Sequence, residues 1–131
     1  MTVNPTLLRR VLWFDALSGL GMAALFLIAG GPVAELTGLP RGLLTATGIA
    51  LVVIAGGILL IATRDPLPRK AVRTLAILNL LWVVDSIALL VLGWVEPTGP
   101  GYALVIGQAV VVAVLAELQL LGLRQPHLAT A

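Results

Sequence analysis

Residues 42–63 read GLLTATGIALVVIAGGILLIAT, a stretch that contains no charged side chain and no proline. In an α-helix each residue adds about 1.5 Å, so about 20 residues cover the hydrocarbon core of a bilayer, which is roughly 30 Å thick. A run of this length and composition predicts a membrane-spanning helix. The fold of the chain follows from how often such runs recur.

Three further apolar runs of similar length occur, at residues 11–30, 74–95 and 101–123. Hydrophobic residues make up 60% of the 131 residues and charged residues only 11%, and the mean hydropathy is +1.10. A single water-surrounded core cannot bury so much apolar surface, which excludes a soluble domain. We therefore predict one all-α integral membrane domain over residues 1–131, in which four transmembrane helices form an antiparallel bundle in the lipid bilayer.

Glycine and proline separate the four apolar runs. Residues 30–32 are Gly-Gly-Pro, residues 65–66 are Asp-Pro, and residues 97–100 are Pro-Thr-Gly-Pro. Such clusters interrupt helices and favour turns. The connections are therefore predicted to be short, which places consecutive helices side by side in opposite directions.

The basic residues are distributed unevenly between the two ends of the predicted helices. Only Arg41 falls in the first and third connections, whereas the other side of the bundle receives Arg9, Arg10, Arg64, Arg69, Lys70, Arg73 and Arg124. Lys and Arg are retained on the cytoplasmic side of a membrane, so both termini are predicted to be cytoplasmic. The excess of Arg over Lys is typical of GC-rich bacterial genomes, and we expect a multi-pass protein of a bacterial inner (plasma) membrane.

Three acidic side chains, Asp15, Asp85 and Glu117, lie within the predicted spans. A carboxylate near the middle of a membrane helix costs roughly 2.5 to 3.5 kcal/mol, so such a residue is expected to face the protein interior, a partner or water. Counted from the cytoplasmic helix ends, Asp15, Asn79 and Glu117 each lie about 10 Å deep. These three side chains are candidates for one polar layer.

A second polar layer is expected deeper in the membrane. Asp85 lies roughly 18 to 20 Å from the cytoplasmic end of its helix, and Gln108 on the last helix reaches a comparable depth. Spacings of three and four residues assign one helix face to Asn79, Trp82, Asp85 and Ser86. We therefore predict that Asp85 is buried in the bundle and hydrogen-bonded, with Gln108 or a hydroxyl of the first or second helix as its neighbour.

These polar side chains allow two interpretations. In the structural one they hydrogen-bond across helices and fix one packing arrangement, while Glu117 reaches the cytoplasmic surface or pairs with Arg10 or Arg124. In the functional one, Asp15 and Asp85 lie in an occluded polar cavity and exchange protons against a cationic or polar solute. Ser18 shares a helix face with Asp15. The sequence indicates no basic or aromatic cage around that acid.

Signals for catalysis or cofactor binding are absent from the sequence. The chain has no cysteine, and its one histidine, His127, lies outside every apolar run. No G-x-S-x-G, H-E-x-x-H or nucleotide-binding glycine motif occurs. We expect no enzyme activity, no catalytic residue, no metal and no cofactor. The formal net charge of +2 gives no reason to expect a nucleic-acid partner.

A four-span chain with an acid in its first helix, here Asp15, resembles the small multidrug resistance transporters. Those proteins work as dimers and use that acid for both proton and drug. The resemblance covers the layout and Asp15 alone. The family has a glutamate there, a shorter chain and often balanced charges, whereas this chain has an aspartate, a second acid at Asp85 and a strong charge bias. Because of these differences, the resemblance does not identify this chain as a member of that transporter family.

Two functions are expected from these observations. The first is a non-catalytic scaffold or accessory subunit that acts through helix packing, as a homo-oligomer or within a larger membrane complex, because four helices enclose little volume. The second is a small proton-coupled transporter or channel that uses Asp15 and Asp85. A cavity that joins one of these acids to a membrane face favours transport, and a closely packed interior favours the scaffold.

Overall fold

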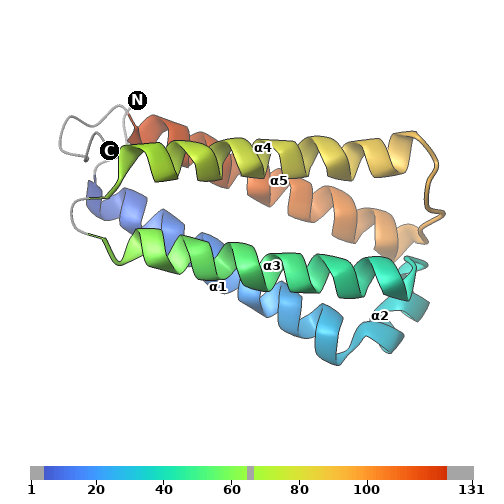
Figure 1. The fold of residues 1–131 in the computed structure, drawn as a ribbon. Helices are drawn as coiled ribbons and strands as arrows, with labels where there is room; N and C mark the ends of the chain where they lie inside the picture. The colour runs from blue at the N-terminus through green and yellow to red at the C-terminus, as the bar shows by residue number, and fades with distance from the viewer. Residues whose placement is uncertain (1–4, 65–66, 124–131) are drawn as a thin grey trace.

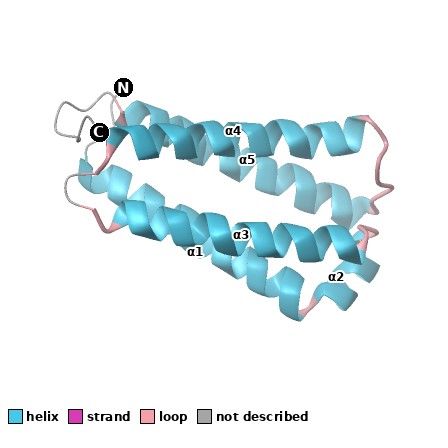
Figure 2. Ribbon diagram, viewed as in Figure 1, coloured by secondary structure: helices cyan, strands magenta, loops and turns pink. Residues whose placement is uncertain are grey.

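The computed structural model describes residues 5–64 and 67–123, which fold into five α-helices (Figures 1 and 2). No β-strand occurs among these residues. Four of the helices are long and apolar enough to cross a membrane, which confirms the prediction of four apolar helices of spanning length. The helices are α1 (Pro5–Ile28), α2 (Gly30–Thr37), α3 (Arg41–Ala62), α4 (Arg69–Val91) and α5 (Gly99–Gly122).

All four long helices begin earlier than predicted, α3 and α5 by one and two residues and α1 and α4 by six and five. α1 begins at Pro5 rather than at residue 11, and α4 begins at Arg69 rather than at residue 74. Each of these two spans was predicted to begin directly after its last basic residue, Arg10 or Arg73. Arg and Lys are good helix formers, however, and their long side chains reach the membrane surface from within a helix, so both helices continue through their basic residues.

The first connection contains the short helix α2, although the Gly-Gly-Pro cluster of residues 30–32 predicts a turn there. The chain bends at Ala29, whose φ of −111° and ψ of 28° are not helical, and the helix resumes at Gly30. Pro32 is tolerated because the N–H groups of a first helical turn have no partner within the helix. The Gly-Gly-Pro cluster therefore marks a junction between two helices rather than a loop.

The end of α2 is fastened to the start of α5. Gly38 ends α2 with a φ of 71°, a left-handed conformation that favours glycine. The Thr98 N–H donates to the Thr37 carbonyl oxygen at 2.9 Å, and the Thr98 hydroxyl donates to the Leu36 carbonyl oxygen at 2.6 Å. Thr98 also caps α5, because its side-chain oxygen accepts from the Gly101 N–H at 3.3 Å.

The four long helices form two pairs (Figure 1). α1 packs along α3 and α4 packs along α5, whereas α3 and α4 have little contact with each other. Figure 1 shows the beginnings of α1 and α4 and the ends of α3 and α5 at one end of the bundle, and α2 at the other. Gly48 permits the close packing of the first pair, because a Cβ there would lie 2.8 Å from Leu27 Cγ.

Two clusters of buried apolar side chains lie toward the two ends of the bundle. The larger, at the end where α1 begins, contains Leu8, Leu12, Ala16, Ile58, Ala62, Leu67, Val72 and Leu75. The smaller, near α2, contains Phe26, Leu39, Leu44 and Val105. Polar side chains lie in the part of the bundle between the two clusters.

Gly101→Ala is expected to destabilise the protein because the new Cβ would collide with the Thr37 carbonyl oxygen. That oxygen accepts the hydrogen bond from the Thr98 N–H that joins α2 to α5. Overpacking of this kind costs about 1 to 3 kcal/mol. Gly99→Ala is the matched control, since a Cβ there has no atom within 4 Å. Denaturant unfolding in detergent measures both. Equal stability of the two variants would contradict the described packing of α2 on α5.

Candidate functional site

Asp15 on α1 is held in the bundle interior by two amide side chains. Asn79 on α4 donates from Nδ2 to Asp15 Oδ2 at 3.0 Å, and Gln119 on α5 donates from Nε2 to the same oxygen at 2.7 Å. Asn79 Nδ2 also donates to Gln119 Oε1 at 3.0 Å, which closes a triangle. All three side chains are buried. We call this group, formed by Asp15, Asn79 and Gln119, the acid layer.

The second oxygen of the Asp15 carboxyl group faces open space. Within the described part of the chain Oδ1 has no hydrogen-bond donor, yet no side-chain nitrogen or oxygen there is both fully buried and unpaired. Oδ1 is therefore accessible, and Asp15 lines a cavity. No described Arg or Lys forms an ion pair with Asp15. Apart from these two amide donors, no described Arg or Lys stabilises a negative charge at this position, so a proton or a cationic ligand would stabilise it further.

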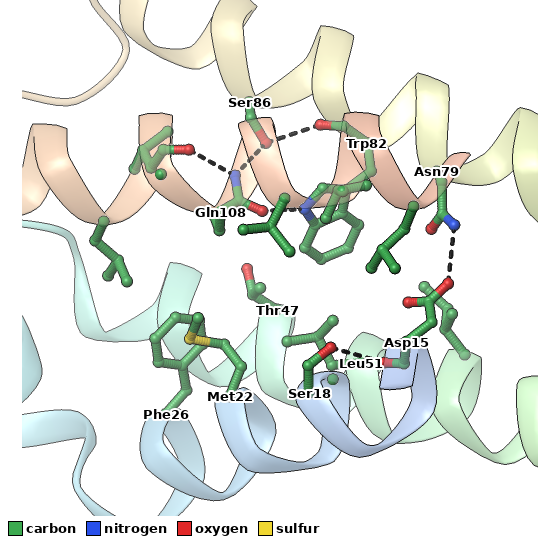
Figure 3. A pocket seen from close by; sticks show the side chains of 18 of the residues that line it. Asp15, Ser18, Met22, Phe26, Thr47, Leu51, Asn79, Trp82, Ser86 and Gln108 are labelled. Carbon is green, nitrogen blue, oxygen red and sulfur yellow. Dashed lines mark hydrogen bonds between the residues drawn. The ribbon is translucent and has the colours of Figure 1, made fainter. Parts of the chain in front are cut away.

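The cavity beside Asp15, here called the interhelical cavity, has a volume of about 480 Å³ and lies between the two helix pairs (Figure 3). Sites for small molecules have volumes of about 300 to 1,000 Å³. All four long helices contribute to the wall, and most of the wall is apolar. The polar residues that line it are Asp15, Ser18, Thr47, Asn79, Trp82, Ser86 and Gln108.

A second polar group joins α4 to α5 at the cavity wall. Trp82 Nε1 donates to Gln108 Oε1 at 2.8 Å, and Gln108 Nε2 donates to Ser86 Oγ at 2.9 Å and to the Val105 carbonyl oxygen at 2.8 Å. Ser86 Oγ in turn donates to the Trp82 carbonyl oxygen at 2.8 Å. These bonds hold the Trp82 ring at the cavity, between the levels of Asn79 and Gln108 (Figure 3). Trp82 thus adds an aromatic ring to the cavity wall, on the helix face that it was predicted to share with Asn79.

Most of the predicted polar residues do come together. The contact between Asp15 and Asn79 confirms their shared layer. Trp82 and Gln108 lie at the cavity as neighbours. Ser18 also lines the cavity, but its hydroxyl donates to the Asp15 carbonyl oxygen of its own helix at 3.0 Å.

The prediction that Asp85 is buried in the bundle is wrong. Asp85 is exposed on α4, and Gln108 is bonded to Trp82 and Ser86 instead. A helix turns about 100° per residue, so two successive steps of three residues rotate Asp85 about 120° away from Asn79. The Asp85 side chain therefore lies outside the inward face of α4, which Asn79 occupies.

Glu117 also lies outside the acid layer, because it is exposed on α5 and Gln119 takes its place. Gln119 follows Gln108 by eleven residues, close to three full helical turns, so the two glutamines share the inward face of α5. That periodicity is present in the sequence and identifies Gln119, whereas depth alone favoured Glu117. The predicted alternative pairing of Glu117 with Arg124 lies outside the described residues.

No protein family, curated protein or solved structure matches this chain.

Asp15→Leu is expected to destabilise the protein by about 1 to 3 kcal/mol, because the buried amides of Asn79 and Gln119 lose the oxygen to which they donate. Asp15→Asn should be milder, since its amide oxygen can accept both bonds. Asp85→Leu is the control and should cause no loss, because it removes an exposed carboxylate that no described residue bonds. Unfolding in detergent compares the three variants. A greater loss in Asp85→Leu than in Asp15→Leu would contradict the acid layer.

Proposed function

We propose that this protein binds an amphiphilic cation in the interhelical cavity and exchanges it for a proton at Asp15. One observation carries the proposal: Asp15 presents an oxygen without a donor to a cavity of ligand size, and no described cation pairs with it. A carboxylate in an apolar interior needs a compensating positive charge. A proton and a cationic solute then compete for one carboxyl group, and this competition couples the two.

The wall of the cavity supports a solute with an apolar body. Met22, Phe26 and Leu51 line the cavity beyond the acid layer, and burial of methylene groups against them is favourable. Trp82 follows Asn79 by three residues on α4, so its ring flanks the space beside Asp15. An aromatic face at this position attracts a cation and adds to the attraction of the carboxylate.

We further propose that the four long helices form an antiparallel bundle in a bacterial inner membrane, with both termini in the cytoplasm, as the distribution of basic residues indicates. Asp15 follows Pro5 by ten residues, which places the acid layer about 15 Å from the cytoplasmic end of α1. In this orientation the cavity extends from the acid layer toward the outer surface.

The topology predicts which introduced cysteines a membrane-impermeant maleimide reaches in intact cells. The chain has no cysteine of its own, so each single variant reports one position. Glu96→Cys, exposed between α4 and α5, should be labelled from outside. Thr63→Cys, exposed after α3, should be labelled only after the membrane is permeabilised. The reverse pattern, or labelling of both in intact cells, would contradict the proposed orientation.

Proton exchange predicts that octyltrimethylammonium added outside protein-containing vesicles raises the pH inside them, because each cation that enters is matched by a proton that leaves. A pH-sensitive dye in the lumen measures this. Asp15→Asn should abolish the pH change, since an amide carries neither the proton nor the charge but keeps the bonds from Asn79 and Gln119. Asp85→Asn is the matched control and should retain the change, because Asp85 does not line the cavity.

Two results of this vesicle assay would contradict the proposal. One is the absence of any pH change with the native protein while octyltrimethylammonium is present. The other is retention of the pH change in Asp15→Asn. Circular dichroism of each variant establishes that it is folded before its result is compared.

A scaffold or accessory subunit is the second candidate, and the exposure of Asp85 favours it. Asp85 lies on α4 beside the exposed apolar residues Leu81, Val84 and Ile87, and no described residue bonds it. A carboxylate is costly in lipid, so a polar group of a second copy or of another membrane protein would stabilise it. No proton exchange by the native protein, with a smaller oligomer for Asp85→Leu, is the outcome that supports this candidate.

A further inference from the structure

We infer that the interhelical cavity recognises its solute at two points, the cationic group at Asp15 and an uncharged hydroxyl group between Thr47 and Gln108. The inference rests on the proposed function, and it adds a second feature to the solute. A chain of methylene groups with a cation at one end and a hydroxyl at the other is the chemical class that fits both points.

Thr47 supplies a hydroxyl that the protein itself does not use. Thr37 and Thr74 each donate to a carbonyl oxygen of their own helix, a common arrangement for a threonine in a helix, whereas Thr45 and Thr47 on α3 do not. The Thr47 hydroxyl makes no such bond, and it lines the cavity from α3. Because no side-chain oxygen in the described chain is both fully buried and unpaired, the Thr47 hydroxyl is accessible from the cavity.

Gln108 supplies an acceptor that is held in one orientation. Its amide nitrogen donates to Ser86 Oγ and to the Val105 carbonyl oxygen, so the amide group cannot turn over without losing both bonds. Its Oε1 accepts one bond, from Trp82 Nε1 at 2.8 Å. An amide oxygen has two lone pairs, so one position on Oε1 remains free. Figure 3 shows Thr47 on α3 opposite Gln108 on α5.

These two groups together match a hydroxyl. Thr47 can donate a hydrogen bond and Gln108 Oε1 can accept one, and a hydroxyl group is both an acceptor and a donor. Neither group is charged, so this point does not favour a second cation or a carboxylate. A solute that brings only a methyl group here leaves the Thr47 hydroxyl and the second lone pair of Gln108 Oε1 without a partner.

The distance between the two points follows from α4. Asn79 bonds Asp15, Ser86 bonds Gln108, and Ser86 follows Asn79 by seven residues, which corresponds to about 10 Å along the helix. An extended octyl chain covers a comparable length. Between the two points the wall is formed largely by apolar side chains, among them Met22 and Leu51.

The test compares octyltrimethylammonium with its ω-hydroxy derivative. The chain has three tryptophans, so Trp13→Phe and Trp94→Phe leave Trp82 as a single fluorophore in the cavity wall. Titration in detergent then gives the dissociation constant of each compound. The hydroxy derivative is expected to bind about fivefold more tightly, the factor that one net hydrogen bond contributes.

Thr47→Val removes the hydroxyl and keeps the shape of the side chain, so the preference for the hydroxy derivative should disappear. Thr45→Val is the matched control, since Thr45 is exposed on α3 and does not line the cavity, and it should keep the preference. Thr47→Ser should also keep it, which distinguishes loss of the hydroxyl from a packing defect. Asp15→Asn should weaken both compounds equally and leave their ratio unchanged.

The outcomes separate this inference from the proposed function. Equal binding of the two compounds to the native protein, or a preference that persists in Thr47→Val, overturns the second point and leaves the exchange at Asp15 intact. Failure of both compounds to bind the native protein overturns the two proposals together.

Discussion

A carboxyl group inside a membrane needs hydrogen-bond donors, and the position of Asp15 imposes this requirement on the whole bundle. The donors come from the other helix pair, Asn79 on α4 and Gln119 on α5, so the acid layer joins the two pairs at one depth. The second link between the pairs lies near the opposite end, where Thr98 bonds Leu36 and Thr37. Among the described residues no hydrogen bond crosses between the pairs from one link to the other, and that is where the interhelical cavity lies.

This arrangement explains how four helices enclose a cavity of ligand size. Between the two links, Trp82 and Ser86 on α4 hydrogen-bond Gln108 on α5. These bonds join α4 to α5 and make no connection to α1 or α3. The two apolar clusters pack toward the ends of the bundle. Asp15 lies where the larger cluster meets the cavity, which is why one of its oxygens is bonded and the other is accessible. In our proposal this second oxygen is the exchange site.

The sequence predicted the four apolar helices and the common depth of Asp15 and Asn79, because hydropathy locates the spans and the helical rise gives the depth of a polar residue. It did not predict α2, since Gly30 and Pro32 are typical both of a turn and of a helix start. The prediction for Asp85 was wrong because it did not add up the rotation about the helix axis over two steps of three residues. Gln119 was missed because its position about the helix axis relative to Gln108 was not considered either. The cavity itself depends on how closely the helix pairs approach, and no local pattern encodes that distance.

Solid-state NMR in lipid bilayers tests the central claim most directly, by measuring whether the labelled N-methyl carbons of octyltrimethylammonium approach the carboxyl carbon of Asp15. Labelled aspartate marks only Asp15, Asp65 and Asp85, and the Asp15→Asn variant identifies the signal of Asp15. Our account predicts a through-space contact within about 6 Å, the range over which opposite charges interact strongly. Contacts of the probe with lipid headgroups or with Asp85 alone, and none with Asp15, would contradict it.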